Sequence, residues 1–303
     1  MTKSSYKVAV IGATGLLGRA VASELAGVKR WEVVRTAFRR GDSTTETLDV
    51  RDEKAVHQFI AFHAPDAIVV TAAERRPDVC EHDPALARAL NVDALRFIAD
   101  AARDCGAWVL SISTDYVFDG TKPPYQPDDP TNPLNAYGRS KLEGERALLA
   151  ANSRSCVLRL PLLYGPVIDW SESAVTSLTP SIVESARAAG IPAVMDAWAI
   201  RYPTFTPDVA VVIRQLLERC ENGNSTSGVV HWSGNEPMTK FEIAEHIAQV
   251  LRVDANITAQ RTPLDLTPRP KDCYLSSRVL EEMGIGRRTP FDKAIRNVLQ
   301  RSM

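Results

Sequence analysis

Residues 6–26 read YKVAVIGATGLLGRAVASELA, and this stretch decides the fold. The apolar run 6–11 predicts a buried strand, and residues 16–26 have the spacing of an amphipathic helix. Between them Gly12, Gly15 and Gly18 form a G-x-x-G-x-x-G turn. Such glycines allow a tight turn and let the backbone approach a pyrophosphate at the helix N-terminus. The stretch therefore predicts the start of a dinucleotide-binding fold, with a ligand-free packing turn as the alternative.

The same alternation of strand and helix continues through the first half of the chain. Apolar strands separated by helices indicate a parallel sheet covered on both faces. Right-handed crossovers then give a Rossmann-type, doubly wound α/β fold. Further strands are expected at residues 31–38, 66–73, 107–113 and 155–165, and helices at 53–62, 85–103 and 135–151.

After Gly165 the regular alternation of strands and helices ends, and a second, smaller lobe is expected. Helices are predicted at residues 171–190, 206–220, 238–251 and 292–300, and a strand at 228–234. Thr239 and Glu242 have the spacing of a capping box. We expect a cofactor domain of residues 1–165, to which segments near 196–235 return. Residues 166–195 and 236–303 would form the discontinuous C-terminal substrate lobe.

Composition excludes several classes of function. The 303 residues carry a formal net charge of -1, so neither nucleic acid nor an acidic membrane surface is an expected partner. We find no signal peptide and no apolar run of membrane-spanning length. The five cysteines form no C-x-x-C pair and the five histidines show no metal-ligand spacing. A cytoplasmic protein without a metal site is expected.

The end of the second predicted strand indicates the type of cofactor. Phe38, Arg39 and Arg40 stand there, about twenty residues after the glycines, where NAD-binding proteins carry an acidic residue. Two guanidiniums suit a 2′-phosphate, so NADP(H) is favoured over NAD(H). Phe38 or Arg39 could stack on adenine. Asp49 could reach the adenine amino group. A solvated pair of surface arginines is the alternative.

Tyr137 and Lys141 lie one helical turn apart in the stretch NAYGRSKLEGE. A nearby ammonium group is expected to lower the pKa of the phenol. Tyr137 would then act as a general acid toward a carbonyl oxygen while hydride arrives at carbon. Thr114 ends the fourth predicted strand, at the edge that faces the ligand crevice, and could hydrogen-bond the same oxygen.

Four motifs carry a resemblance to a known family. GATGLLG, STDYVFDG, PLNAYGRSKLEGE and RLPLLYG resemble extended short-chain dehydrogenases/reductases, in particular dTDP-4-dehydrorhamnose reductases. Together with AAERRPDV and HWSGNEPMTK, they more closely resemble the related regulatory β-subunits of methionine adenosyltransferase. The resemblance implies a catalytic triad of Thr114, Tyr137 and Lys141. It implies a cofactor site that also includes Thr14, Leu16, Leu17, Val50, Ala72, Ala73, Glu74, Arg75 and Leu163.

The resemblance also implies a substrate pocket and two competing functions. Asp115, Val117, Arg201 and Arg269 are expected in the pocket, with packing or surface salt bridges as the alternative. The first function is reduction by NADPH of a dTDP- or UDP-linked 4-keto-6-deoxyhexose, as in rhamnose biosynthesis.

The second function is that of a non-catalytic, NADP-binding partner of a methionine adenosyltransferase catalytic subunit. Animal β-subunits dock through a long tail after the segment that matches RTPF. Here DKAIRNVLQRSM follows Phe291, so that docking mode is not expected. A homodimer is left open.

Cys80 is a candidate for a further activity, epimerisation of the sugar. The stretch RRPDVCEHD is similar to plant-type 3,5-epimerase/4-reductases, in which a cysteine is an acid/base on the sugar carbons. Their second acid/base is a lysine or histidine, and residues 165–199 contain neither. Asp196 or Glu172 would have to replace it. The alternative is that Cys80 is a packing residue.

Overall fold

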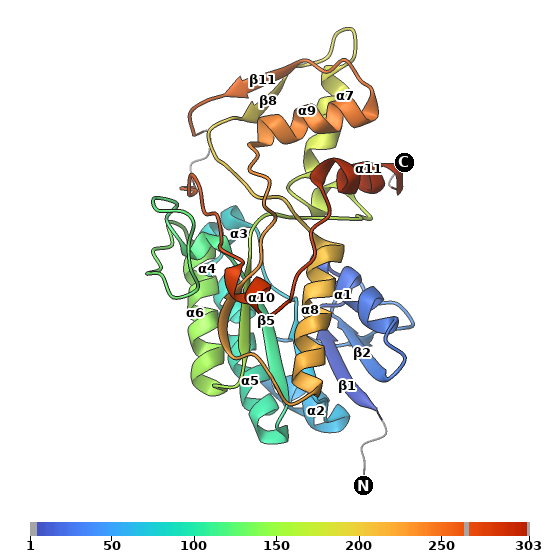
Figure 1. The fold of residues 1–303 in the computed structure, drawn as a ribbon, viewed down its shortest axis with the longest axis vertical. Coiled ribbons are helices and arrows are strands. Elements are labelled where there is room, and N and C mark those ends of the chain that lie inside the picture. The colour runs from blue at the N-terminus through green and yellow to red at the C-terminus, as the bar shows by residue number, and fades with distance from the viewer. Residues whose placement is uncertain (1–4, 264–266, 302–303) are drawn as a thin grey trace.

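A seven-stranded parallel sheet lies at the centre of the computed structural model, which describes residues 5–263 and 267–301 (Figure 1). Its strand order, β10-β6-β5-β4-β1-β2-β3, is that of a doubly wound sheet, so the predicted Rossmann-type fold is confirmed. The strands are β1 Tyr6–Ile11, β2 Trp31–Ala37, β3 Glu46–Thr47, β4 Ala67–Val70, β5 Trp108–Thr114, β6 Cys156–Leu160 and β10 Gly228–His231. The predicted ranges that include residues 1–4, 264–266 and 302–303 extend beyond the described residues there.

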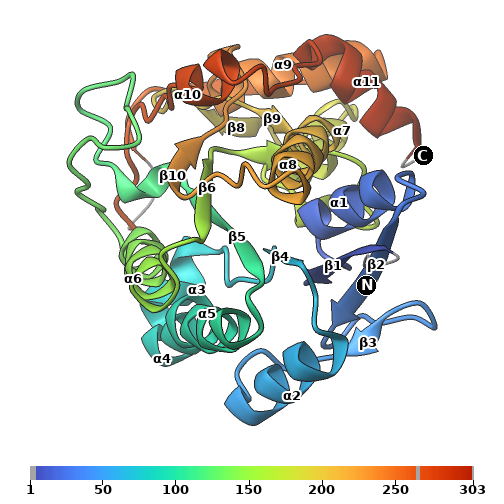
Figure 2. The same cartoon turned by 60° about the horizontal axis from the view of Figure 1, so that its bottom comes forward.

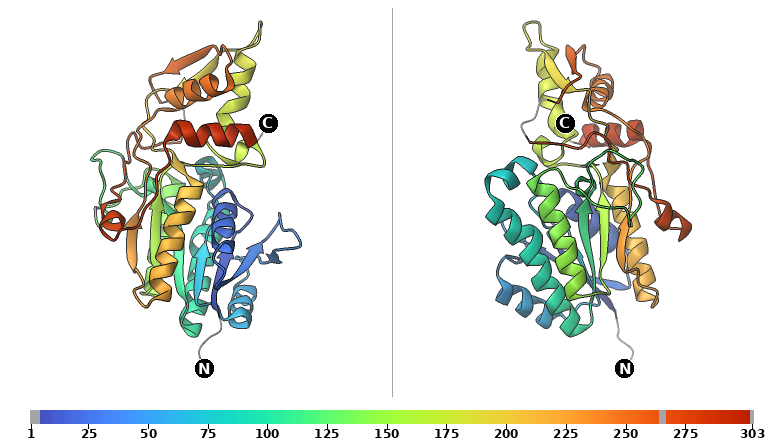
Figure 3. Two further views of the ribbon diagram at one scale, coloured as in Figure 1. Left: turned by 45° about the vertical axis from the view of Figure 1, so that its right-hand side comes forward. Right: turned by 90° about the vertical axis from the view of Figure 1, so that its left-hand side faces the viewer.

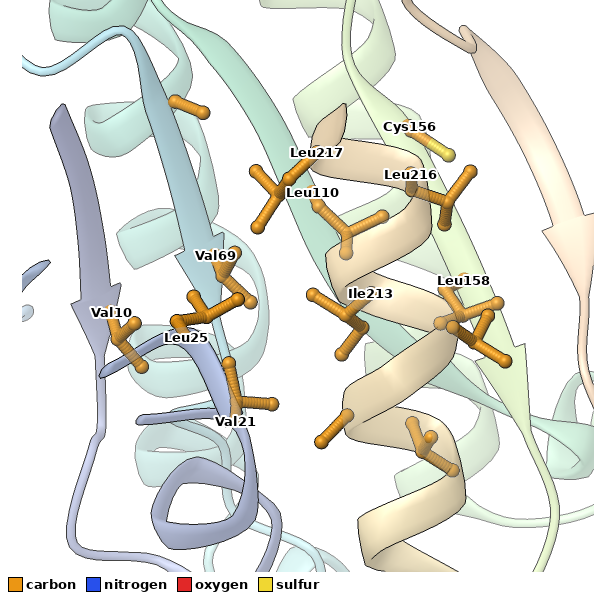
Figure 4. Close-up of a cluster of buried hydrophobic side chains, with 14 of the residues drawn as sticks. Val10, Val21, Leu25, Val69, Leu110, Cys156, Leu158, Ile213, Leu216 and Leu217 are labelled. Carbon is orange, nitrogen blue, oxygen red and sulfur yellow. The ribbon is translucent and has the colours of Figure 1, made fainter. Parts of the chain in front are cut away.

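Helices cover both faces of this sheet (Figure 2). One face carries α1 (Leu16–Ala26) and α8 (Thr206–Glu221), and the other carries α2 (Glu53–His63), α5 (Ala94–Cys105) and α6 (Ala136–Ala151). Figure 4 shows Leu25 of α1 and Ile213 of α8 directed toward sheet residues such as Val69. Each such buried side chain contributes about 1.5–3 kcal/mol to folding.

A second group of elements packs beyond the carboxyl ends of the strands (Figures 1 and 3). Its apolar core includes Ile182, Ile243 and Ile295, all without exposed surface. The predicted capping box of Thr239 and Glu242 is confirmed. The elements are α7 Thr179–Ser185, α9 Lys240–Leu251, α11 Phe291–Arg301 and the parallel strand pairs β7 (Leu163–Tyr164) with β9 (Thr204–Phe205) and β8 (Ala193–Asp196) with β11 (Ile257–Gln260).

Three predicted elements are wrong in extent. The expected helix 171–190 is two 3-10 turns, η3 (Trp170–Glu172) and η4 (Thr176–Leu178), followed by the short α7. The Ser173 hydroxyl accepts from the backbone N–H of Val175 at 3.0 Å, which competes with helical bonding there. The expected helix 85–103 is α4 (Pro84–Arg88), the π-helical turn η1 (Ala89–Asp93) and α5.

The expected strand 155–165 divides after Leu160. Pro161 lacks the N–H that a central strand must donate, and the chain pairs again only in β7. The sequence pattern also missed short elements: α3 (Pro77–His82), η2 (Asp115–Val117), α10 (Arg278–Glu282), β3, β8, β9 and β11. Across the described part of the chain, no helix combines the length and apolarity needed to cross a membrane.

Candidate dinucleotide and catalytic site

The glycine turn brings β1, the segment after β4 and α1 into close backbone contact. Gly12 has a φ of 87°, and a Cβ there would lie 2.7 Å from the Ala72 nitrogen. A Cβ on Gly18 would lie 2.1 Å from the Gly12 oxygen, so α1 can approach β1 only with glycine at this position. Gly15 is the N-cap of α1 and provides no side-chain cap. The first N–H groups of α1 thus lack a side-chain acceptor, which fits an anionic pyrophosphate. Thr14, Leu16 and Leu17 belong to this turn and the start of α1.

The residues expected at the adenine end lie together after β2. Phe38 is 47% exposed, and the guanidinium carbons of Arg39 and Arg51 lie 5.7 and 5.2 Å from its ring centroid. Arg51 donates to the Asp49 carboxylate at 2.6 Å and thereby lowers its pKa. The Asp49 carboxylate is therefore shared with Arg51, and its contact to adenine stays a prediction. Arg40 pairs with Glu172.

The segment after β4 forms the next part of the predicted cofactor site. Ala72 packs on Gly12, and Val50 is buried in the neighbouring core. Asn91 holds the Glu74 backbone from both sides, accepting from its N–H and donating to its carbonyl at 3.0 Å each. Asn91 also donates to the Ser140 hydroxyl at 3.0 Å and so ties this segment to α6. Sequence reasoning missed Asn91, because a π-helical turn leaves no pattern that identifies it.

The other predicted cofactor-site residues, in that segment and in β7, contact groups of the protein itself. The Glu74 carboxylate accepts from Arg76 at 2.7 Å, and Arg75 donates to the Ser171 carbonyl at 3.2 Å. Ala73 lies between Ala72 and Glu74. Leu163 is half-buried against the main core. Their contacts with a cofactor stay predictions.

Helix α6 presents Tyr137 and Lys141 to the ends of β5 and η2. The Asn135 side chain caps α6 by accepting from the Gly138 N–H at 2.9 Å. A Cβ on Gly138 would lie 2.2 Å from the Tyr116 oxygen, so only glycine lets α6 approach η2 this closely. Lys141 is buried and its Nζ donates to the Ile112 carbonyl of β5 at 2.8 Å. Burial lowers the pKa of Lys141 to about 8.

Tyr137 has a raised pKa, and the expectation of a lowered one was wrong for this structure. Burial is the largest cause, and the charge of Asp115 adds to it, while a hydrogen bond with Thr114 acts in the opposite direction. No contribution from Lys141 offsets these effects, and its ammonium group donates to the Ile112 carbonyl. Tyr137 is therefore a protonated donor at neutral pH, with the Thr114 hydroxyl beside it.

Asp115 and Arg201 come from two different segments, and both are buried close enough for the charge of Arg201 to act on the Asp115 carboxylate. Asp115 is 6% exposed, and burial raises its pKa to about 6, opposed by the nearby charge of Arg201. Arg201 donates to the Pro270 carbonyl at 3.0 Å, and its guanidinium lies 5.7 Å from the ring centroid of Tyr116. The Tyr116 ring lies edge-on to Tyr137 at 5.9 Å. Sequence reasoning missed Tyr116, which bridges the phenol and the arginine.

The other two predicted pocket residues lie differently. Val117 has no exposed surface and packs in a cluster with Phe118 and Leu142, so its side chain faces the core. Arg269 lies 3.7 Å from the Asp78 carboxylate of α3. Any substrate contact by these two residues stays a prediction.

The three residues considered for epimerase chemistry are poorly suited to it. Cys80 has no exposed surface, and burial raises its thiol pKa to about 11. Glu172 is held by Arg19 and Arg40, which lower its pKa. Asp196 accepts from the backbone N–H groups of Trp198 and Ala199 at 2.8 and 3.1 Å. Neither carboxylate pairs with Cys80, and the thiol is protonated at neutral pH.

In an assay of the expected reductase activity, replacement of Cys80 by serine should change turnover by less than about threefold, because the thiol is a buried packing group. Deuterium incorporation from solvent at the sugar carbons should be absent in both proteins. The measurement is proton NMR of a nucleotide-linked 4-keto-6-deoxyhexose incubated in deuterated buffer. Incorporation by the unmodified protein that Cys80→Ser abolishes would contradict this assignment.

A buried ion-pair network lies next to Lys141 on the C-terminal side along α6. Glu145, one helical turn further along α6, accepts from Arg159 of β6 at 2.7 Å and from the Ser113 hydroxyl. Both charged side chains are 4% exposed. His231 of β10 lies 3.4 Å from the Arg159 guanidinium, and burial lowers its pKa to about 3, so it is neutral. The charge of Glu145 partly offsets the effect of burial on Lys141.

The sheet, the glycine turn and the Tyr137–Lys141 pair at its carboxyl edge define a Rossmann-type protein of the short-chain dehydrogenase/reductase class. The chain belongs to the RmlD substrate binding domain family, which it matches over residues 6–303. Within residues 5–263 and 267–301, no cluster of three or more potential metal ligands occurs.

Relatives of this chain include proteins with two different names. It is 45% identical over 295 residues to methionine adenosyltransferase 2 subunit beta of Bos taurus, covering 97% of this chain and 87% of the relative. It is 29% identical over 303 residues to dTDP-4-dehydrorhamnose reductase of Aggregatibacter actinomycetemcomitans, covering 96% and 98%. A crystal structure of a dTDP-4-dehydrorhamnose reductase from Clostridium acetobutylicum is 27% identical, with a TM-score of 0.84 over 97% of this chain and 98% of that one.

Proposed function

We propose that this protein binds NADP(H) and reduces the 4-keto group of a nucleotide-linked 4-keto-6-deoxyhexose, without epimerising the sugar. The observation that carries this proposal is the convergence of Thr114, Tyr137 and Lys141 at the carboxyl edge of the sheet, the edge from which the glycine turn also starts. The family and its 29%-identical reductase relative support it.

NADPH, when bound, supplies the hydride that is added to the carbonyl carbon. Tyr137 donates its phenolic proton to the carbonyl oxygen as negative charge develops there, which completes the alcohol. Thr114 orients the same oxygen through its hydroxyl. Lys141, one turn from Tyr137, would hold the nicotinamide ribose when the cofactor is bound.

The buried Asp115 and Arg201 are proposed to hold the sugar. A neighbouring carboxylate and guanidinium would offer an acceptor and a donor set for sugar hydroxyls. Arg201 is fixed by the carbonyls of Ile200 and Pro270, at 3.0 Å each, so little ordering remains for substrate binding. The nucleotide carrier, dTDP or UDP, is left open by these contacts.

Changing Arg39 and Arg40 together to alanine should remove the preference for NADPH over NADH. Loss of charge-assisted contacts to the 2′-phosphate should weaken NADPH binding on the order of 10- to 100-fold and leave NADH binding nearly unchanged. Titration of nicotinamide fluorescence measures both affinities. The control is Arg30→Ala at the opposite end of β2, where Arg30 pairs with Glu221 at 2.9 Å. An unchanged preference in the double variant would remove both arginines from cofactor recognition.

A second candidate function is that of an NADP-binding regulatory subunit for a methionine adenosyltransferase. It is favoured by the identity of 45% to the beta subunit, against 29% to the reductase. On sequence identity alone this is the stronger of the two. It needs NADP(H) binding but no proton donor, so Tyr137→Phe should leave partner binding unchanged. Co-purification with a methionine adenosyltransferase catalytic subunit, with both proteins at known concentration, tests it.

A further inference from the structure

Glu172 lies among arginines of the predicted cofactor site, although it belongs to a different part of the chain. It ends the 3-10 turn η3, on the segment that follows β7, and is 7% exposed. One carboxylate oxygen accepts from Arg40 at 2.9 Å and from Arg19 at 3.1 Å. The other accepts from Arg19 at 2.5 Å and from the Ile168 N–H at 3.0 Å. Both oxygens are thus fully used.

The arginines come from the elements that bracket the dinucleotide site. Arg19 lies in the first turn of α1, directly after the glycine turn, and also donates to the Thr14 carbonyl at 2.9 Å. Arg40 follows β2, and its side chain is 63% exposed. From the end of β4, Arg75 donates to the carbonyl of Ser171, next to Glu172. Arginines from α1 and from the segments that follow β2 and β4 therefore hold this one turn.

A carboxylate and a phosphate are the two anions that guanidinium groups bind best. From this we infer that Glu172 occupies Arg40 in the cofactor-free protein and competes with the 2′-phosphate of NADP(H). It would act as a specificity-determining residue that weakens binding of 2′-phosphorylated dinucleotides and spares the others. This inference rests on the proposed function, since it takes Arg40 as a reader of the 2′-phosphate.

The Glu172 carboxylate and a bound 2′-phosphate are both negative and would repel each other. A 2′-phosphate at Arg40 would bring about two negative charges close to the buried Glu172 carboxylate, while the exposed Arg40 side chain leaves their repulsion open to screening by salt. Either the Arg40–Glu172 pair breaks or the two anions share the guanidinium. NADH has no 2′-phosphate, so its binding requires neither the loss of the Arg40–Glu172 pair nor a guanidinium shared between two anions.

The test is the affinity of Glu172→Gln for NADPH and NADH, followed by nicotinamide fluorescence at low ionic strength. NADPH should bind roughly 3- to 10-fold more tightly than to the unmodified protein, and NADH should change less than about twofold. High salt should reduce the difference. Glu172→Asp, which keeps the charge, should behave like the unmodified protein. Asp169→Asn is the matched control, because Asp169 caps the same turn through the Ser171 N–H at 2.9 Å and contacts no arginine there.

The outcomes separate this inference from the proposed function. If the unmodified protein does not bind NADPH, the proposed function fails. If it binds NADPH with the expected preference while Glu172→Gln binds it equally or more weakly, only the inference is overturned.

A second measurement does not depend on that variant folding. Trp170 stands two residues before Glu172, so displacement of the turn should alter its emission. Adenosine 2′,5′-bisphosphate should produce the change and 5′-AMP should not, and the signal should be lost in Trp170→Phe. Equal responses to both nucleotides would contradict displacement of Glu172 by a 2′-phosphate.

Discussion

Replacing Tyr137 with phenylalanine should lower reductase turnover by about 10²- to 10⁴-fold, while NADPH affinity changes by less than about twofold. The phenol lies next to Thr114 and one turn from Lys141, and in the proposed reaction it gives its proton to the substrate oxygen. The substitution removes one oxygen and keeps the ring that packs edge-on against Tyr116. Turnover is followed by the loss of nicotinamide absorbance, and affinity by fluorescence titration.

The matched control for this variant is Tyr6→Phe. Tyr6 begins β1, at the opposite end of the sheet from the site, and its buried phenol interacts with Cys220. It should keep full turnover. Equal activity of Tyr137→Phe and Tyr6→Phe would exclude Tyr137 as the proton donor.

Replacing Glu145 with alanine should reduce the free energy of unfolding by about 3–5 kcal/mol. The change leaves the Arg159 guanidinium buried beside neutral His231, and the Ser113 hydroxyl loses its acceptor. Desolvation of an unpaired charge is the main cost. For a chain of this length we expect the thermal midpoint to fall by more than about 5 °C.

Glu143→Ala is the control for this second prediction. Glu143 lies on the same helix, two residues before Glu145, and its exposed side chain is 3.9 Å from Arg88. Such exposed pairs contribute about 0–1 kcal/mol. Chemical denaturation of both variants measures the difference. A loss in Glu145→Ala no larger than in Glu143→Ala would show that the buried pair adds nothing to stability.

The sheet and its helices could be predicted because each buried parallel strand is a continuous apolar run. Residues 6–26 alone define β1, the glycine turn and α1. The second half was predicted less well, because β8, β9 and β11 have only two to four residues each and gain their structure from tertiary contacts. The helix expected over 171–190 is mostly turns, because the Ser173 hydroxyl accepts from the Val175 N–H and competes with helical bonding.

In the candidate site, too, local sequence patterns predict some features, and contacts between distant segments determine the others. Tyr137 and Lys141 are four residues apart, so helical periodicity brings them together. The pairing of Glu172 with Arg19 joins residues 153 positions apart, and no local pattern predicts it. The raised pKa of Tyr137 was also unpredictable, since it depends on burial and on the nearby charge of Asp115.

The most direct test of the reductase proposal is one assay. The purified protein is mixed with NADPH and dTDP- or UDP-4-keto-6-deoxyglucose, with and without a separate 3,5-epimerase, and nicotinamide absorbance is followed. We expect NADPH oxidation to form a rhamnose-type product only when the epimerase is added. No oxidation in any mixture, with NADPH binding intact, would contradict the reductase proposal and leave the regulatory role as the function to test.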